Sequence, residues 1–175
     1  HYKKYVELED LTGAAAQNIG WVLSALGREE EAIKNYEQGL EENPGHFGIL
    51  DNKSISHEHL GQYDDAIKCL DTILEDTPDR VDTFFKKCKL LVKVGKITEA
   101  IEGFELIQSK NREDSFPPAE DILNNIGWSW IQKGENEKGL EYVEEALKIN
   151  SNDDILDSKA VALFNLKRYA ESKEY

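Results

Sequence analysis

The chain has 175 residues, of which 39% are hydrophobic and 32% are charged, and its formal net charge is -14 at pH 7. This composition supplies enough apolar residues for a folded core. The acidic charge argues against nucleic acid as a partner, because phosphate backbones are bound through basic patches. No apolar run reaches the length of a membrane span, so no membrane association is expected.

The two ends of the sequence do not form finished units. Residues 1–12 are interpreted as the end of a preceding repeat helix, and residues 153–175 as a unit that stops inside its second helix. Helical repeat arrays usually close with a polar capping helix. The sequence is therefore predicted to be an excerpt of a longer array.

From Gly13 onward the sequence repeats, and the clearest marker is the spacing of 34 residues between Gly27, Gly61 and Gly95. Units counted from Gly13 also share small residues at their eighth and twentieth places. The eighth places hold Gly20, Ser54, Cys88, Gly127 and Ala160, and the twentieth places hold Ala32, Ala66, Ala100, Gly139 and Ser172. Small residues at these fixed places predict that two helices approach closely in every unit.

Prolines and one insertion mark the boundaries of the predicted units. Pro44 and Pro78 are predicted to end the second helices of the first two units. The predicted unit ranges are 13–46, 47–80, 81–114, 120–152 and 153–175. Residues 115–119, which include two prolines, form an insertion that either simply connects two units or places Phe116 over a binding groove or against another subunit.

These units resemble the tetratricopeptide repeat (TPR) family, which has small residues at the eighth and twentieth places, a turn glycine and a terminal proline. The resemblance implies an all-α fold, a right-handed α-superhelix (solenoid) of antiparallel helix-turn-helix units. It also implies a protein that binds other proteins and is not an enzyme. In this family the first helix of each pair lines the concave groove.

The resemblance places several apolar side chains on that concave wall. Trp21 and Trp128 occupy the same ninth place in their units, and Ile55 and Phe85 lie on the same wall. Exposed tryptophans of this kind are typical anchors of protein interfaces. The alternative is that neighbouring helices or the long third connection cover them.

Polar side chains on the same wall are predicted to hold the backbone and charges of a ligand. Asn18, Asn52 and Asn125 share the sixth place of the first helix, and an amide both donates and accepts hydrogen bonds. Lys86 and Lys89 are predicted to meet an acidic group. A purely structural role for the asparagines is the alternative.

Catalytic and metal sites are not predicted, and no cofactor is expected. His57 and His59 are two residues apart on a helix and point about 200° apart, so they do not converge on a metal ion. Ser54 beside His57 has no oxyanion hole or orienting group in the sequence. Cys69 and Cys88 have no metal-like spacing and are predicted to be buried free thiols, which fits a cytoplasmic location.

The sequence therefore predicts a non-enzymatic scaffold that holds a peptide or helix of a partner protein in its concave groove. One alternative is a structural assembly module that associates with itself as a homo-oligomer. Another is a substrate-recruiting arm of a larger enzyme.

Overall fold

The computed structural model describes residues 2–110 and 116–173, with side chains from Gly13 onward. These described residues form helices and no strand, so the predicted all-α class is confirmed. The chain divides into two compact units, residues 1–83 and 84–175.

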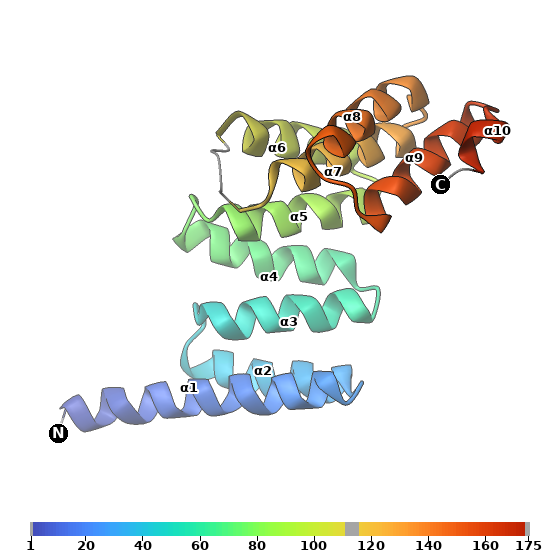
Figure 1. The fold of residues 1–175 in the computed structure, drawn as a ribbon. Coiled ribbons are helices and arrows are strands. Elements are labelled where there is room, and N and C mark those ends of the chain that lie inside the picture. The colour runs from blue at the N-terminus through green and yellow to red at the C-terminus, as the bar shows by residue number, and fades with distance from the viewer. Residues whose placement is uncertain (1, 111–115, 174–175) are drawn as a thin grey trace. The chain divides into compact units, whose positions relative to one another are not determined.

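The first unit contains α1 (Tyr2–Ala25), α2 (Glu29–Glu42), α3 (Phe47–His59), α4 (Tyr63–Asp76) and the first residues of α5 (Val81–Lys93). Consecutive helices run antiparallel and lie side by side from α1 to α4 (Figure 1). The first helices α1 and α3 also contact each other. This arrangement places the first helix of one repeat next to the first helix of the following repeat.

The second unit contains the rest of α5, then α6 (Ile97–Lys110), α7 (Ala119–Gln132), α8 (Asn136–Ile149), α9 (Asp153–Asn165) and α10 (Tyr169–Ser172). The helix α7 packs on both α8 and α9, and α9 packs on α10 (Figure 1). The two first helices α7 and α9 are therefore neighbours, as α1 and α3 are in the first unit.

The N-terminal segment differs from its expected role. The helix α1 continues without a break from Tyr2 to Ala25, so residues 2–12 extend the first helix of the first repeat and do not end a separate helix. The physical reason is that residues 1–12 contain no proline or glycine that would terminate a helix. Gly13 lies in the interior of that helix, where its backbone is close to the ring of His46.

The turn inside each repeat has one geometry. Gly27, Gly61, Gly95 and Gly134 all have a positive φ, between 71° and 90°. In the first turn Arg28 N–H donates to Leu23 O over 2.9 Å, and each of the other three glycine turns has the equivalent bond. This bond joins an N–H to the carbonyl five residues earlier and encloses a residue in the left-handed conformation, which is the Schellman motif that ends a helix. Glycine adopts that conformation without steric cost, so one glycine recurs in each of these turns.

The small residues lie where two helices come closest, as predicted. A Cβ added at Gly127 on α7 would lie 2.8 Å from the carbonyl oxygen of Gly139 on α8. At the same place in the first repeat, Gly20 packs against the ring of Tyr36. The side chains of Ala32, Ala66 and Ala100 are fully buried. Close helix approach at the eighth and twentieth places is thus confirmed.

The second helices of the first two repeats end shortly before the prolines. The helix α2 ends at Glu42, two residues before Pro44, and α4 ends at Asp76, two residues before Pro78. The next helix then begins with its own cap in two places. The ring of His46 accepts a hydrogen bond from Ile49 N–H, and the amide oxygen of Asn152 accepts one from Ile155 N–H.

Candidate protein-binding surface

The most accessible of the predicted anchors is Trp21 on α1. Its side chain is 61% exposed, which is high for the largest apolar side chain. It follows Gly20, whose lack of a side chain lets the ring of Tyr36 pack directly on the helix backbone. The close packing on that side of α1 leaves Trp21 outside the core.

The other predicted residues of the first unit lie on the two neighbouring helices. Asn18 on α1 is exposed, whereas Asn52 and Ile55 on α3 are half-buried. The two helices touch where Gly48 on α3 meets the side-chain amide of Gln17 on α1. An exposed tryptophan, an exposed amide and a partly open apolar side chain therefore belong to one pair of adjacent first helices.

Trp128 in the second unit is less accessible than Trp21. It is half-buried and packs against a core cluster in which Leu123, Ile131, Val143 and Ile155 are buried. Part of its ring thus contributes to the folded core. The shared ninth place in the repeat does not give the two tryptophans the same exposure.

Phe85 is not open to a partner, contrary to the expectation from its place on the concave wall. Only 7% of its surface is exposed. Its ring packs edge-on against Phe104 on α6, with centroids 5.4 Å apart, and against Phe116, with centroids 6.5 Å apart. The insertion explains this burial, because it places Phe116 next to Phe85.

Phe116, which contacts Phe85, is itself exposed, with 64% of its surface accessible. It precedes a cis peptide bond to Pro117, which is buried. The sequence feature that pointed to an exposed Phe116 was an aromatic residue next to two prolines within an insertion. Ser115 and residues 111–114 lie outside the described part of the chain.

Asn125 uses part of its amide within its own helix. Its Nδ2 donates to Asp121 O over 2.8 Å, and Ser129 Oγ donates to Asn125 O over 2.7 Å. The neighbouring Asn124 has a buried Oδ1 with no hydrogen-bond partner among the described residues. Because this oxygen has almost no accessible surface, it is not open to a ligand.

Charged groups surround Asp121, a half-buried residue at the start of α7. Burial first, and then the nearby charge of Glu120, raises the pKa of Asp121, while the charge of Lys89 on α5 lowers it. Asp154 on α9 adds a further negative charge that raises it. Lys89 is exposed and Lys86 is half-buried. The predicted Lys89 therefore lies in an acidic environment within its own unit.

The two histidines of α3 turn to different partners, as their spacing predicted. His57 Nδ1 donates to Gln62 Oε1 over 2.7 Å, and His59 Nδ1 donates to Glu29 Oε1, also over 2.7 Å. Ser54 is buried, and its hydroxyl donates to Asp51 O. Within the residues that the structure describes, no three His, Cys, Asp or Glu side chains are grouped to hold a metal ion.

Both cysteines are buried and unpaired, as predicted. Burial raises the pKa of the Cys69 thiol and raises that of Cys88 to about 12. Neither sulfur is therefore activated as a thiolate nucleophile at neutral pH.

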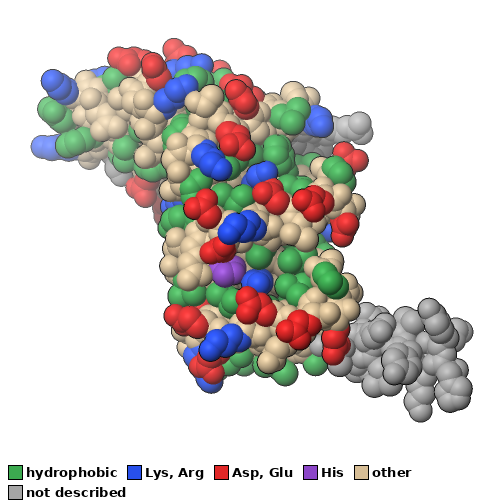
Figure 2. Space-filling model, turned by 180° about the vertical axis from the view of Figure 1, so that it is seen from behind, with side chains coloured by type: hydrophobic (Ala, Val, Ile, Leu, Met, Phe, Trp, Pro, Cys, Tyr) green, Lys and Arg blue, Asp and Glu red, His purple; other side chains and the backbone are tan. Residues whose placement is uncertain are grey.

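The charged side chains are distributed over the surface without forming a single basic area on the visible face. Figure 2 shows Lys and Arg side chains interspersed with Asp and Glu among the described residues of that face. Some charged side chains form local pairs within one helix region, such as Arg28 with Glu31 and Lys68 with Asp65. None of the described helices has the length and apolarity needed to cross a membrane.

Helix pairs with Schellman turns, closely packed small residues and partly open first helices define the chain as an all-α repeat scaffold. Comparison with known proteins gives the family. Tetratricopeptide repeat profiles match residues 23–84 and residues 120–153, which together make up more than half of the chain. The chain belongs to the tetratricopeptide repeat family, whose fold is that of a scaffold for protein–protein interaction.

Two curated relatives share lower but extended similarity. Tetratricopeptide repeat protein 1 of Schizosaccharomyces pombe is 24% identical over 119 residues, which are 67% of this chain and 11% of that protein. The mouse N-alpha-acetyltransferase 16, NatA auxiliary subunit, is 26% identical over 102 residues, which are 50% of this chain and 12% of that protein. The chain thus spans about a tenth of the length of these relatives.

A solved structure agrees on the fold. A tetratricopeptide repeat protein from Parabacteroides merdae superimposes with a TM-score of 0.82 at 18% identity, covering 93% of this chain and 62% of that one. The agreement extends over nearly all of the chain and so includes the repeats outside the two profile matches.

Proposed function

We propose that this chain binds a peptide or helix of a partner protein along the first helices of its repeats. In the first unit the contact surface is formed by Trp21 and Asn18 on α1 together with Asn52 and Ile55 on α3. In the second unit it is formed by Lys86, Lys89, Asn125 and the open part of Trp128, with Phe116 in place of the buried Phe85. The chain itself is not an enzyme.

The observation that carries this proposal is the 61% exposure of Trp21 beside an exposed amide on the same helix. Fully burying a large aliphatic or phenyl side chain is favourable by about 1.5–3 kcal/mol, so an exposed indole ring gains free energy when a partner covers it. Tryptophan is also enriched among the residues that dominate binding energy at interfaces. Asn18 and Asn52 add hydrogen bonds to a ligand backbone, each of about 0.5–1.5 kcal/mol.

A second candidate is a scaffold that recruits proteins to a separate catalytic subunit. The similarity to a NatA auxiliary subunit favours it, since that relative is by its name a subunit that assists an acetyltransferase. In this case the surface around Trp21 contacts the catalytic subunit or its substrate. The two candidates use the same residues and differ only in the partner.

The test is affinity capture with three forms of the chain: the unchanged sequence, Trp21→Ala and Leu26→Ala. Leu26 is the matched control, because it is an exposed apolar residue of the segment that follows Trp21 and lies outside the proposed surface. We expect a set of proteins that Trp21→Ala loses and Leu26→Ala retains, identified by mass spectrometry. Equal capture by all three forms would refute the proposed surface.

Two checks make the result interpretable. Circular dichroism of each variant verifies that the helices are intact. Trp128→Ala is not used, since removal of a ring that packs on the core cluster would leave a cavity and destabilise the fold. Light scattering at increasing concentration tests self-association, and a mass that rises with concentration and falls in Trp21→Ala would assign the surface to a homo-oligomer.

A further inference from the structure

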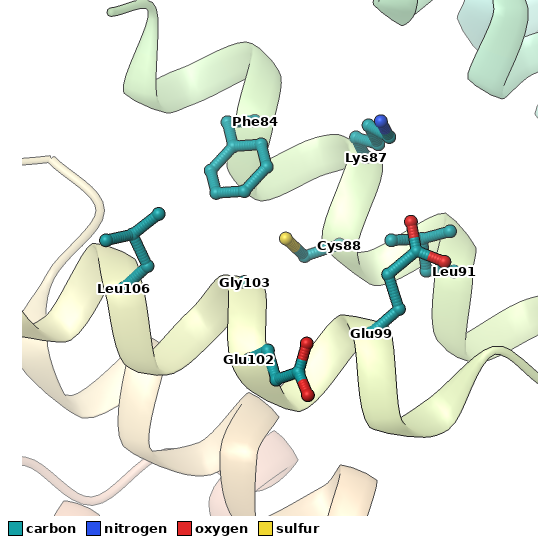
Figure 3. Close-up of a pocket in the computed structure, with 8 residues that line it drawn as sticks. All are labelled: Phe84, Lys87, Cys88, Leu91, Glu99, Glu102, Gly103 and Leu106. Atoms are coloured by element: carbon teal, nitrogen blue, oxygen red, sulfur yellow. The ribbon is translucent and has the colours of Figure 1, made fainter.

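A pocket lies at the edge of the third repeat, between α5 and α6, away from the proposed surface. Its volume is about 250 Å³. Phe84 and Leu91 line it from α5, Leu106 lines it from α6, and Cys88 and Gly103 form its floor. Figure 3 shows the ring of Phe84 and the thiol of Cys88 pointing from α5 towards the α6 backbone at Gly103. We name this hollow the edge pocket.

The edge pocket lies beside a close contact between α5 and α6 at Gly103. Gly103 is the twenty-third residue of its unit, where the fourth repeat carries the large side chain of Tyr142. Any Cβ at Gly103 would collide with the sulfur of Cys88, so the two helices meet there with no room for a side chain. The space beyond this contact remains open to solvent.

The walls of the edge pocket are apolar and its rim is acidic. Leu106 is 47% exposed at the mouth, whereas Leu91 and Cys88 are buried below it. Glu99 and Glu102 are exposed on the α6 side, and Lys87 is half-buried on the α5 side. Among the described residues neither carboxylate belongs to an ion pair. The rim therefore attracts positive charge, in a chain whose net charge is -14.

The size of the edge pocket suits one side chain. Sites for small molecules generally enclose about 300–1,000 Å³, which is more than is available here. A single Leu or Phe side chain fills such a hollow and buries the exposed part of Leu106. Its chain neighbours then lie over Glu99 and Glu102.

From these features we infer that the edge pocket is a second docking site, which takes an apolar side chain flanked by Lys or Arg residues from a partner peptide. It acts independently of the proposed function. The lining residues Phe84, Lys87, Cys88 and Leu91 form one stripe of α5. The residues of the proposed surface on the same helix, Lys86 and Lys89, lie roughly on its opposite side, since successive residues are about 100° apart. Both surfaces can therefore be occupied at once.

The test uses a short acetylated peptide with a central phenylalanine between arginines, titrated into the ¹⁵N-labelled chain. We expect saturable amide shifts at Cys88, Gly103 and Leu106, with no change in the indole signal of Trp21. A peptide with glutamates in place of the arginines, and one with alanine in place of the phenylalanine, should cause no saturable shift at these amides. Saturable shifts at these amides with either control peptide, or their absence with the arginine peptide, would overturn the inference.

Charge-reversed variants complete the test. The double variant Glu99→Lys and Glu102→Lys should bind the arginine peptide about tenfold more weakly or worse. High salt should also weaken this binding, because it screens the attraction between the rim and the arginines. The matched control is Glu137→Lys with Glu145→Lys, two exposed acidic residues of α8 that change the net charge equally. Leu106→Ala, an exposed substitution that preserves the fold, should also weaken binding. Equal affinity of both charge-reversed variants, or shifts centred on Trp21, would contradict a specific edge pocket.

Discussion

His59 at the end of α3 donates its Nδ1 hydrogen to Glu29 at the start of α2, over 2.7 Å. The same pair of places in the fourth and fifth repeats holds Asn136 and Asn165, whose amides are joined over 2.9 Å. One polar contact thus recurs between successive repeats, with different chemistry. In the first case Ser24 Oγ also donates to Glu29, so a buried carboxylate holds three elements together: α1, α2 and α3.

Removal of the Glu29 charge should destabilise the first unit. Burial raises the pKa of Glu29, but hydrogen bonds from Ser56, His59 and Ser24 together lower it by more, so its pKa is lowered. The structure gives no well-formed hydrogen bond between Ser56 and Glu29, so we attribute the effect mainly to His59 and Ser24. Glu29→Gln should reduce the free energy of unfolding by about 1–3 kcal/mol at pH 7, measured by urea denaturation.

The pH dependence gives this prediction a second measurement. A carboxyl whose pKa is lower in the folded state stabilises the protein above its ordinary pKa of about 4.3, and this stability is lost as the pH falls through the folded pKa. The difference between the unchanged chain and Glu29→Gln should therefore shrink at acidic pH. Glu30→Gln, at an exposed neighbour, should change stability by less than about 0.5 kcal/mol. A similar loss at Glu30, or a constant difference at all pH values, would contradict this account.

A methyl group at Gly127 should be costly. In an ordinary helix interior Gly→Ala is stabilising by about 1 kcal/mol. At Gly127 the added Cβ would lie 2.8 Å from a backbone carbonyl of α8, which cannot rotate away. Gly127→Ala should therefore lower the free energy of unfolding by about 1–3 kcal/mol.

The matched comparison for Gly127 is Gly103→Ala. Its added Cβ meets the thiol of Cys88, a side chain, and not the backbone of another helix. Combining it with Cys88→Ala should recover most of the lost stability, whereas no single side-chain substitution should rescue Gly127→Ala. Thermal unfolding followed by circular dichroism measures all of these variants. A Gly127→Ala protein as stable as the unchanged chain would show that the helices separate easily.

The sequence predicts the repeat fold well because local rules are repeated at fixed spacing. Turn glycines, small contact residues and helix-ending prolines each have one physical role, and the structure places Gly27, Gly127 and Pro44 in those roles. The exposure of the wall residues depends instead on neighbours that the repeat pattern does not specify. Phe85 is covered by a residue of the insertion and Trp128 by the adjacent core, so equal places in the repeat give unequal access.

The fifth turn carries the one non-glycine residue with positive φ among the described residues. Lys167 has φ 61° and the same Schellman bond as the other turns, from Arg168 N–H to Leu163 O. A side chain on a residue with positive φ destabilises the folded state by about 1–2 kcal/mol. Replacement by glycine removes this strain, but glycine loses more conformational entropy on folding, which offsets part of the gain. Lys167→Gly should therefore raise the free energy of unfolding by about 0.5–1 kcal/mol.

The reciprocal change serves as the control for the fifth turn. Gly134→Lys places a side chain in the equivalent turn of the fourth repeat, where φ is 90°, and should destabilise the second unit. Both variants alter one positive charge on an exposed residue, so their charge effects are comparable in size. Urea denaturation of the pair should give opposite signs. Destabilisation by Lys167→Gly would mean that the lysine side chain contributes a contact larger than the backbone strain.

The pKa of Asp121 should respond to the charges of α5 and α9 in the second unit. Since burial and the charges of Glu120 and Asp154 raise its pKa while Lys89 lowers it, Lys89→Met should raise the pKa of Asp121 further. Asp154→Asn should have the opposite effect. The sign for stability is the reverse of that for Glu29, because an acid with a raised folded pKa binds its proton more tightly in the folded state. This carboxyl therefore opposes folding increasingly as the pH rises from about 3.9 through the folded pKa.

Carbon-detected NMR titration of the Asp121 carboxyl measures these shifts directly. Lys93→Met, which removes an exposed lysine from the last turn of the same helix, is the control and should leave the Asp121 pKa close to its original value. An equal rise with both lysine variants would indicate a general effect of net charge. A rise confined to Lys89→Met would show that α5 and α7 present their charges to the same side of the second unit, as ligand binding through Lys89 requires.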